Sequence, residues 1–296
     1  MPVEGRNVLL TGASGSIGAE IAKQLAARGA RLVLCGRRVS RLEALAGELA
    51  REGGARPAVL PADLGRRGEA QRLAEQALDA LGSVHVLINN AGAAMQGLSW
   101  VVGDREEARE VVETNLWSPL ALAAALAPQM VEDGDGTIIN VGSLAWISPF
   151  PHLGHYAASR AALAAVTQVM HAELAPRGVR VVEVALGPVD TPASRENRIL
   201  KGADRWLDGG PGLGNPKAAA EAIVAAAAGR SGGVGFYPRI LRWVHRFPGL
   251  GRRYAARATK HADVLDTTVR LGGSAGDGEL QKLRHEAEMT TNSATT

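Results

Sequence analysis

The fold is decided by the stretch Asn7-Val8-Leu9-Leu10-Thr11-Gly12-Ala13-Ser14-Gly15-Ser16-Ile17-Gly18. Its apolar start predicts a strand, and apolar residues at helical spacing from Ala19 to Arg28 predict a helix after the glycines. Glycines permit a tight turn and close backbone approach, and the free amides at a helix start receive a pyrophosphate. Although a plain tight turn would also use glycines, strand, turn and helix in this order predict a dinucleotide site.

The rest of the chain repeats the alternation of short apolar runs and helix-period stretches. Further strands are predicted at Arg31–Cys35, Pro57–Leu60, Val84–Asn89, Thr137–Val141, Val179–Ala185 and Val234–Tyr237. These runs are mostly apolar throughout, as in strands that are covered on both faces. The sequence therefore predicts an α/β fold, a doubly wound parallel sheet of the Rossmann type with about seven strands flanked by helices.

Length and composition limit the classes of protein to consider. At 296 residues with 46% hydrophobic and 21% charged residues, the chain is globular, which excludes disordered and collagen-like classes. Cys35 is the single cysteine, so we expect no internal disulfide and no zinc site built on cysteines, and we predict no metal site elsewhere. The start, Met1 to Gly5, lacks a signal-peptide pattern, and apolar runs such as Leu120–Pro128 are too short to span a bilayer. We expect a cytoplasmic protein.

Charge is distributed unevenly along the chain. The net charge is +3, but the segment 230–260 holds eight basic residues and no acidic ones, so the remainder carries 3 − 8 = −5. This argues for a basic surface patch and against binding of nucleic acid by the whole domain. We divide the chain into a catalytic domain (1–237), a basic amphipathic extension (238–275) and a flexible tail (276–296).

The second predicted strand ends in Gly36-Arg37-Arg38. An enzyme that uses NAD would place an acid here for the ribose 2′-hydroxyl, about 20 residues after the glycine turn. Two guanidinium groups instead suit the 2′-phosphate of NADP(H), by charge and by bidentate geometry. A solvated pair at a helix start is the alternative.

From about Val3 to Tyr237 the chain resembles the short-chain dehydrogenase/reductase family, in its compact single-domain branch. The resemblance rests on ordered motifs: the glycine turn, Asp63-Leu64, Asn89-Asn90-Ala91-Gly92, Asn115, Ser143, Tyr156 and Gly187-Pro188-Val189-Asp190-Thr191. It implies that the cofactor contacts Gly12, Ser14, Gly15, Ile17, Gly18, Arg37, Arg38, Asp63, Leu64, Asn90, Ala91, Gly92, Tyr156, Arg160, Gly187, Val189 and Thr191. Two of these groups have structural alternatives, since Asp63 could cap the following helix and the Asn-Asn-Ala-Gly run could be only a turn.

The same resemblance implies the catalytic residues Tyr156, Ser143, Asn115 and Arg160. Tyr156 would exchange a proton with a carbonyl oxygen, Ser143 would orient that oxygen, and Asn115 would hold a relay water. Because a phenol is a poor base at neutral pH, a cation must favour the phenolate. The family has lysine where this chain has Arg160, which keeps the charge but alters the proton relay. Ser16 and Leu186 also depart from the family pattern, in place of glycine and proline.

The predicted substrate loops carry mostly apolar side chains. They are Ala93–Gly97, Leu144–Leu153 and a long loop over about Ser194–Pro216 around Trp206 that could form a lid. Apolar loops favour a hydrophobic ketone or secondary alcohol as substrate. The alternative function is a protein that binds NADP(H) with weak or no catalysis, a sensor or scaffold, because Arg160 replaces the relay lysine.

Between Pro238 and Pro248 the sequence predicts a basic amphipathic helix. Its apolar face would hold Ile240, Trp243, Val244 and Phe247, and its other face Arg239, Arg242 and Arg246. Such a helix could lie on an anionic membrane surface, or could pack over the substrate cleft or against a subunit. The family resemblance implies a homo-oligomer.

Overall fold

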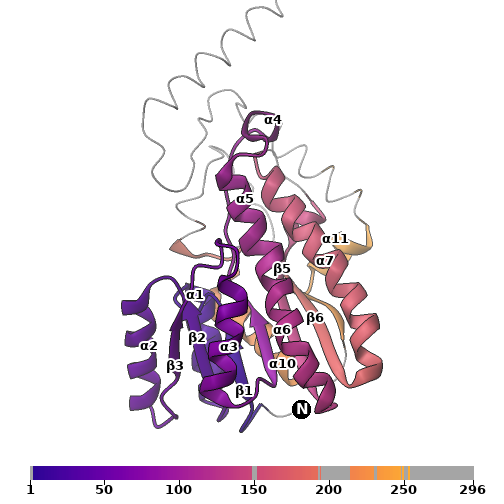
Figure 1. Ribbon diagram of the computed structural model, residues 1–296. Helices are drawn as coiled ribbons and strands as arrows, with labels where there is room; N and C mark the ends of the chain where they lie inside the picture. Colours follow the sequence, from indigo (N-terminus) through magenta and orange to yellow (C-terminus); the bar gives the residue numbers. More distant parts are fainter. Residues whose placement is uncertain are drawn as a thin grey trace, which may run out of the picture.

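The seven strands form one parallel sheet in the order β3-β2-β1-β4-β5-β6-β7 (Figure 1). The computed structural model describes residues 3–148, 152–192, 194, 214–229, 232–247, 249 and 253. The predicted doubly wound sheet is confirmed. The strands are β1 (Asn7–Leu10), β2 (Arg31–Gly36), β3 (Ala58–Pro61), β4 (Val86–Asn89), β5 (Gly136–Ser143), β6 (Val179–Leu186) and β7 (Gly233–Tyr237).

The predicted strand ends differ where side chains or prolines replace ladder bonds. β3 starts at Ala58 because Pro57 has no N–H to donate. β4 starts at Val86, since the N–H of Val84 bonds to Oε1 of Gln129 instead of a neighbouring strand. β5 and β6 pair over their whole length, up to Ser143 opposite Leu186, so both strands extend to the edge where the candidate site lies.

Helices connect the strands and cover both faces. They are α1 (Ser16–Ala26), α2 (Val39–Arg51), α3 (Glu69–Leu81), α4 (Ser99–Val102), α5 (Glu106–Val112), the π-helical turn η1 (Glu113–Trp117), α6 (Ser118–Glu132), the 3-10 turns η2 (Leu144–Trp146) and η3 (Ala175–Arg177), α7 (Gly154–Leu174), α10 (Pro216–Ala228) and α11 (Leu241–Arg246). Figure 1 shows α3, α6 and α7 in front of the sheet and α10 behind it.

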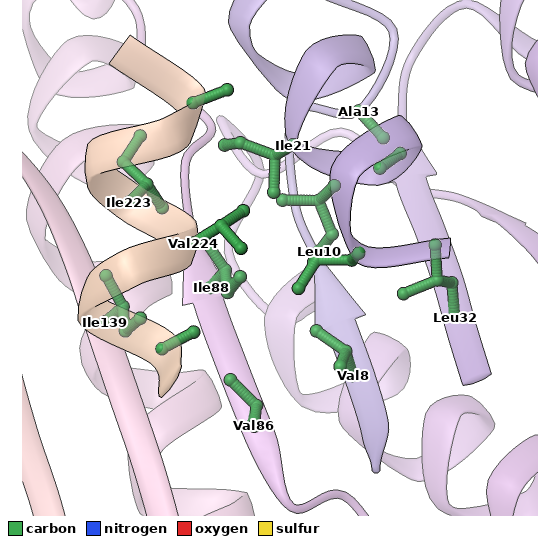
Figure 2. Packing of buried hydrophobic residues seen from close by; sticks show 14 of the residues in the cluster. Val8, Leu10, Ala13, Ile21, Leu32, Val86, Ile88, Ile139, Ile223 and Val224 are labelled. Atoms are coloured by element: carbon green, nitrogen blue, oxygen red, sulfur yellow. The ribbon is translucent and has the colours of Figure 1, made fainter. Parts of the chain in front are cut away.

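Two apolar layers explain why the strand sequences are apolar throughout. Alternate side chains of β1 point to opposite faces, with Val8 and Leu10 packing toward α1 and α10 and Leu9 toward α3 and α6. Figure 2 shows Ile223 and Val224 of α10 beside Ile88 and Ile139 of the sheet. The central strands β1 and β4 therefore bury both of their faces, whereas the edge strands β3 and β7 are only partly buried.

The order of the strands reverses beside β1, where β2 and β4 are its two neighbours. In open α/β sheets, ligands bind at such a switch point, outside the carboxyl ends of the strands. The glycine turn follows β1 and the Asn90–Gly92 turn follows β4, so the fold brings both predicted cofactor segments to this point.

The apolar residues of the C-terminal helix lie in two different settings. Leu241 is buried against Leu144 and Ile147, and Val244 packs beside it. Ile240, Trp243 and Phe247 are instead exposed. The six residues of α11 dock through Leu241, which leaves these three on the outer side.

Several predicted segments lie outside the described residues. They include Trp206 and most of the loop over 194–216. Near the end of that loop, Asn215 is described and caps α10 by accepting a bond from the N–H of Ala218. They also include the tail 276–296. The division of the chain into domains stays a prediction. Among the described residues, no helix is long and apolar enough to cross a membrane.

Candidate active site

Two glycines of the first turn are required by close packing. Gly12 has a φ of +67°, and a Cβ there would lie 2.8 Å from the Cα of Ala91. A Cβ on Gly18 would lie 2.2 Å from the carbonyl oxygen of Gly12. The glycines therefore let the turn touch both its own helix and the segment after β4.

Hydrogen bonds join the glycine turn to the Asn90–Gly92 turn. The Thr11 hydroxyl oxygen accepts bonds of 3.0 Å from the backbone N–H groups of Asn90 and Ala91. The Asn90 amide donates to the carbonyl of Thr11 at 3.0 Å and to that of Gly12 at 3.3 Å. The Asn90–Gly92 segment is thus a turn that is bonded to the glycine turn.

The start of α1 is suited to a phosphate group. Gly15 is the N-cap residue and contributes no side-chain cap, and the first turn of α1 contains no acidic residue. Helix-start amides and the positive end of the helix dipole favour an anion. Ser16 and Ile17 begin this helix, and Ser14 lies just before it, so the residues present fit a pyrophosphate.

Arg38 reaches the same turn from the end of β2. Its Nη2 donates to the carbonyl of Ser14 at 2.8 Å, and both Arg37 and Arg38 are exposed. A Cβ on Gly36 would lie 2.9 Å from Oγ of Ser14, so glycine at this position allows the approach. The guanidinium of Arg38 therefore borders the turn, while its position before α2 also fits an exposed pair at a helix start.

Asp63 and Leu64 lie after β3 in different settings. Oδ1 of Asp63 accepts a bond from the N–H of Gly65, and α3 begins only at Glu69, so Asp63 does not cap that helix. Leu64 is buried, and its carbonyl accepts a bond from the Ser118 hydroxyl. The predicted adenine contact of Leu64 stays a prediction.

The segment after β6 is held by backbone bonds. The N–H of Gly187 donates to the carbonyl of Tyr237 at 2.7 Å, and Val189 pairs with Gly214. Thr191 and Ser194 bond reciprocally through their hydroxyls and N–H groups. Gly187, Val189 and Thr191 thus occupy an ordered loop at the carboxyl edge of the sheet.

Asn115 lies in the π-helical turn η1 and is fully buried. Its side-chain oxygen accepts a bond from the N–H of Ala93, and its amide donates to the Ala93 carbonyl and the Ser159 hydroxyl. The side chain therefore ties the loop after β4 to α7. Single π turns inside α-helices are frequent at functional sites.

Ser143 and Tyr156 stand at the end of β5 and in the first turn of α7. The Ser143 oxygen accepts a bond from the N–H of Ala145, which leaves the hydroxyl hydrogen free to donate elsewhere. Arg160 lies one helical turn after Tyr156, and its Cζ is 5.4 Å from the centre of the Tyr156 ring. Nη1 of Arg160 donates to the carbonyl of Val141, two residues before Ser143.

The guanidinium of Arg160 points into the protein. The residue is 6% exposed, and a Cβ on Gly92 would lie 2.2 Å from its Nη2. A side chain at position 92 would therefore displace the end of the Arg160 side chain. Arg160 joins the turn after β4, the end of β5 and the ring of Tyr156.

Glu183 is a buried acid near this site that the sequence reasoning missed. Its Oε1 accepts a 3.0 Å bond from Nε1 of Trp146, and the side chain fills the space above Gly142. Burial raises the pKa of Glu183 to about 7, although the Trp146 bond and the charge of Arg160 oppose the rise. The sequence could have indicated this residue, because Glu183 is the single acidic residue within the apolar run of β6.

Some side chains predicted to face the substrate pack elsewhere. Met95 lies in a small cluster with Val102, and Leu144 packs against Leu241, while Phe150 is outside the described residues. His152 is buried, and His155 bonds to the carbonyl of Gly103, in keeping with packing and surface roles. The described residues contain no group of three or more His, Cys, Asp or Glu that could hold a metal ion.

Comparison with known proteins identifies the family. The family model described as short chain dehydrogenase matches residues 6–200. The chain belongs to this family, whose members are oxidoreductases that act on C=O or CH–OH groups with a nicotinamide cofactor.

Individual relatives are similar over most of the chain. A fatty acyl-CoA reductase of Mycobacterium tuberculosis is 32% identical over 84% of this chain and 82% of its own. Mouse dehydrogenase/reductase SDR family member 7B is 37% identical over 63% of this chain, which spans only 58% of the mouse protein. A solved short-chain oxidoreductase in complex with NADP is 28% identical, with a TM-score of 0.67 over 80% of this chain and 98% of its own.

The position of Glu183 predicts a pH dependence of stability. Because its pKa rises from 4.5 to about 7 on folding, the folded chain keeps a proton that the unfolded chain loses in this window. The free energy of unfolding should therefore fall as pH rises through the window, by roughly 3 kcal/mol at most. Denaturant unfolding of Glu183→Gln and wild type from pH 4.5 to 8 measures the difference.

The exposed Glu173 of α7 provides the control, because Glu173→Gln should follow the wild type. A wild type whose stability relative to Glu183→Gln does not change between pH 4.5 and 8 would contradict the prediction.

Proposed function

We propose that the protein is an NADP(H)-dependent reductase of hydrophobic ketones, with the reverse oxidation of secondary alcohols at the same site. The observation that carries the proposal is the placement of Arg160, bonded to the Val141 carbonyl beside Ser143 and 5.4 Å from the ring of Tyr156. A cation and a phenol therefore lie together near the end of β5, the strand that also carries Ser143.

The chemistry follows from these groups. When bound, the nicotinamide exchanges a hydride with the carbonyl carbon. Tyr156 gives a proton to the carbonyl oxygen, and the Ser143 hydroxyl donates a hydrogen bond that orients the same oxygen. Arg160 stabilises the phenolate that remains, through its charge. Because the Asn115 side chain is occupied by Ala93 and Ser159, its part in proton transfer would fall to its backbone carbonyl.

Preference for NADP(H) is supported by Arg37 and Arg38 at the end of β2, with Arg38 next to Ser14. Charge-assisted bonds to a 2′-phosphate contribute roughly 1.5 to 3 kcal/mol, which is about ten-fold to more than a hundred-fold in affinity.

We therefore expect NADPH to bind more tightly than NADH, and the Arg37→Ala/Arg38→Ala variant to lose that preference. Fluorescence titration with both cofactors measures it. Arg51→Ala, at the other end of α2, removes an exposed arginine far from the turn and should keep the preference. Equal affinities in the wild type would refute the assignment.

The substrate class is inferred from the names of relatives. One relative is named a fatty acyl-CoA reductase, another, from Nostoc, a ketoacyl reductase, and a solved structure a putative betaketoacyl-ACP reductase. We therefore propose a ketone on a long acyl chain. The competing function is cofactor binding with little catalysis, on the ground that Arg160 replaces lysine.

Two substitutions separate these functions. Tyr156→Phe should abolish ketone reduction, followed by NADPH absorbance with long-chain 3-oxoacyl thioesters, and should leave NADPH binding nearly intact. Arg160→Lys should not raise the rate, since the shorter ammonium is misplaced relative to the Val141 carbonyl. An inert wild type that Arg160→Lys activates, by the roughly 10² or more that a placed proton-transfer group contributes, would favour the cofactor-binding function.

We also propose a cytoplasmic homo-oligomer with a peripheral membrane contact through 238–248. Ile240, Trp243 and Phe247 are 56%, 57% and 49% exposed, and the last two rings stack with centroids 6.2 Å apart. Arg239, Arg242 and Arg246 are exposed beside them. Exposed aromatic rings among arginines suit the interface of an anionic bilayer.

Cosedimentation with anionic vesicles should be salt-sensitive, and Trp243→Ser/Phe247→Ser should abolish it because burial of the rings and charge act together. Trp100→Ser, which removes a 72% exposed ring on α4, is the control and should bind normally. The membrane contact would be refuted if the wild type does not bind vesicles at low salt. If light scattering then shows that the oligomer dissociates in the double variant, this face is a subunit contact.

A further inference from the structure

A hollow lies between α10 and β7, the strand at one edge of the sheet. Its volume is about 270 Å³, near the lower end of ligand pockets, which run from roughly 300 to 1,000 Å³. Val184 of β6 and Val234 and Phe236 of β7 form apolar walls. None of the residues that line the hollow is among those assigned to the candidate active site, so the proposed reaction does not account for it.

Small residues leave this hollow open. Ala222 and Ala226 line it from α10, where they are one helical turn apart, and Gly235 lines it from the middle of β7. The nearest atoms to a Cβ on Gly235 would be 3.7 and 3.9 Å away, which is ordinary contact distance. A side chain at position 235 is therefore sterically allowed, and the hollow is not a consequence of close packing at this glycine.

Two arginines complete the lining. Arg239 precedes α11 and Arg242 lies in its first turn, and both are exposed. Within the part of the chain that the structure describes, neither guanidinium has a hydrogen bond or an ion pair. No acidic side chain lines the hollow. The solvent-facing part of the lining therefore carries two positive charges that these residues do not neutralise.

From these features we infer that the hollow is a second ligand site, which binds a fatty-acid anion. The alkyl chain lies against the apolar walls, and this contact removes apolar surface from water. The carboxylate accepts charge-assisted hydrogen bonds from Arg239 and Arg242. The volume suits one alkyl chain, whereas the two chains of a phospholipid would exceed it.

The lining distinguishes this ligand from simpler ones. A small inorganic anion would use only the arginines, and an uncharged lipid would use only the apolar walls. A ligand that uses both parts must carry an anionic head on an apolar chain. The rings proposed to contact a membrane, Trp243 and Phe247, do not line the hollow, so the two sites can be tested separately.

Calorimetric titration of the full chain with decanoate, below the concentration at which decanoate forms micelles, tests the inference. The wild type should bind decanoate, and should bind decanol and inorganic phosphate roughly ten-fold more weakly or less well still. Arg239→Gln/Arg242→Gln should weaken decanoate binding roughly ten-fold or more, because the carboxylate loses its donors. Arg246→Gln, on the same helix but outside the lining, is the matched control and should bind as the wild type does.

A second pair of variants tests the apolar part. Ala226→Leu should weaken decanoate binding roughly ten-fold or more, because the added side chain takes the space of the alkyl chain. Ala225→Leu places the same side chain on the exposed side of α10 and should bind normally. Should Ala226→Leu not fold, Gly235→Ala fills less of the hollow with ordinary contacts only and should weaken binding by a smaller factor.

The inference would be overturned by a wild type that binds no decanoate, or that binds phosphate as tightly. It would also be overturned if decanoate binding is unchanged in the arginine variant or in a folded filling variant. Trp243→Ser/Phe247→Ser should keep decanoate binding whatever its effect on vesicle binding. Because no ketone or NADPH is added, the result does not depend on the proposed reaction.

Discussion

The hydrogen bond from Arg160 to the Val141 carbonyl is the interaction on which the candidate site depends. It draws the guanidinium under the segment after β4, where its Nη2 lies 2.2 Å from the position of a Cβ on Gly92. The segment after β4 is also bonded to Thr11 and Gly12 through Asn90. The glycine turn is therefore linked to α7 by way of this segment and Arg160. One buried cation thereby joins the cofactor cradle to Tyr156.

Arg160 is buried, and this limits the role that it can have at the site. Arginine cannot give up its proton, so its effect on Tyr156 is one of charge and position. Glu183 is a second buried ionisable group near this site, and its bond to Trp146 connects it to η2 and, through the Trp146 ring, to His245 of α11.

Much of the fold could be predicted from the sequence, because apolar runs and glycine turns are local features. The first residue of β4 could not be predicted, because the N–H of Val84 bonds to the side chain of Gln129, which is distant in sequence, instead of to a neighbouring strand. Helical spacing also could not predict which apolar residues of α11 are buried. Contact between Leu241 and Leu144 decides this, and the two residues are far apart in the sequence. The family resemblance proposed Ser143, Tyr156 and Arg160 as site residues, but the inward direction of the guanidinium could not be predicted, because it depends on the distant Val141 carbonyl.

The most direct test of this account is a crystal structure of the protein with NADP⁺. The account predicts that the Arg160 guanidinium stays on the Val141 carbonyl, that the 2′-phosphate lies against Arg38, and that the nicotinamide ring faces the Tyr156 hydroxyl. A structure in which Arg160 leaves this carbonyl to extend into solvent, or in which Tyr156 faces away from the nicotinamide, would contradict it.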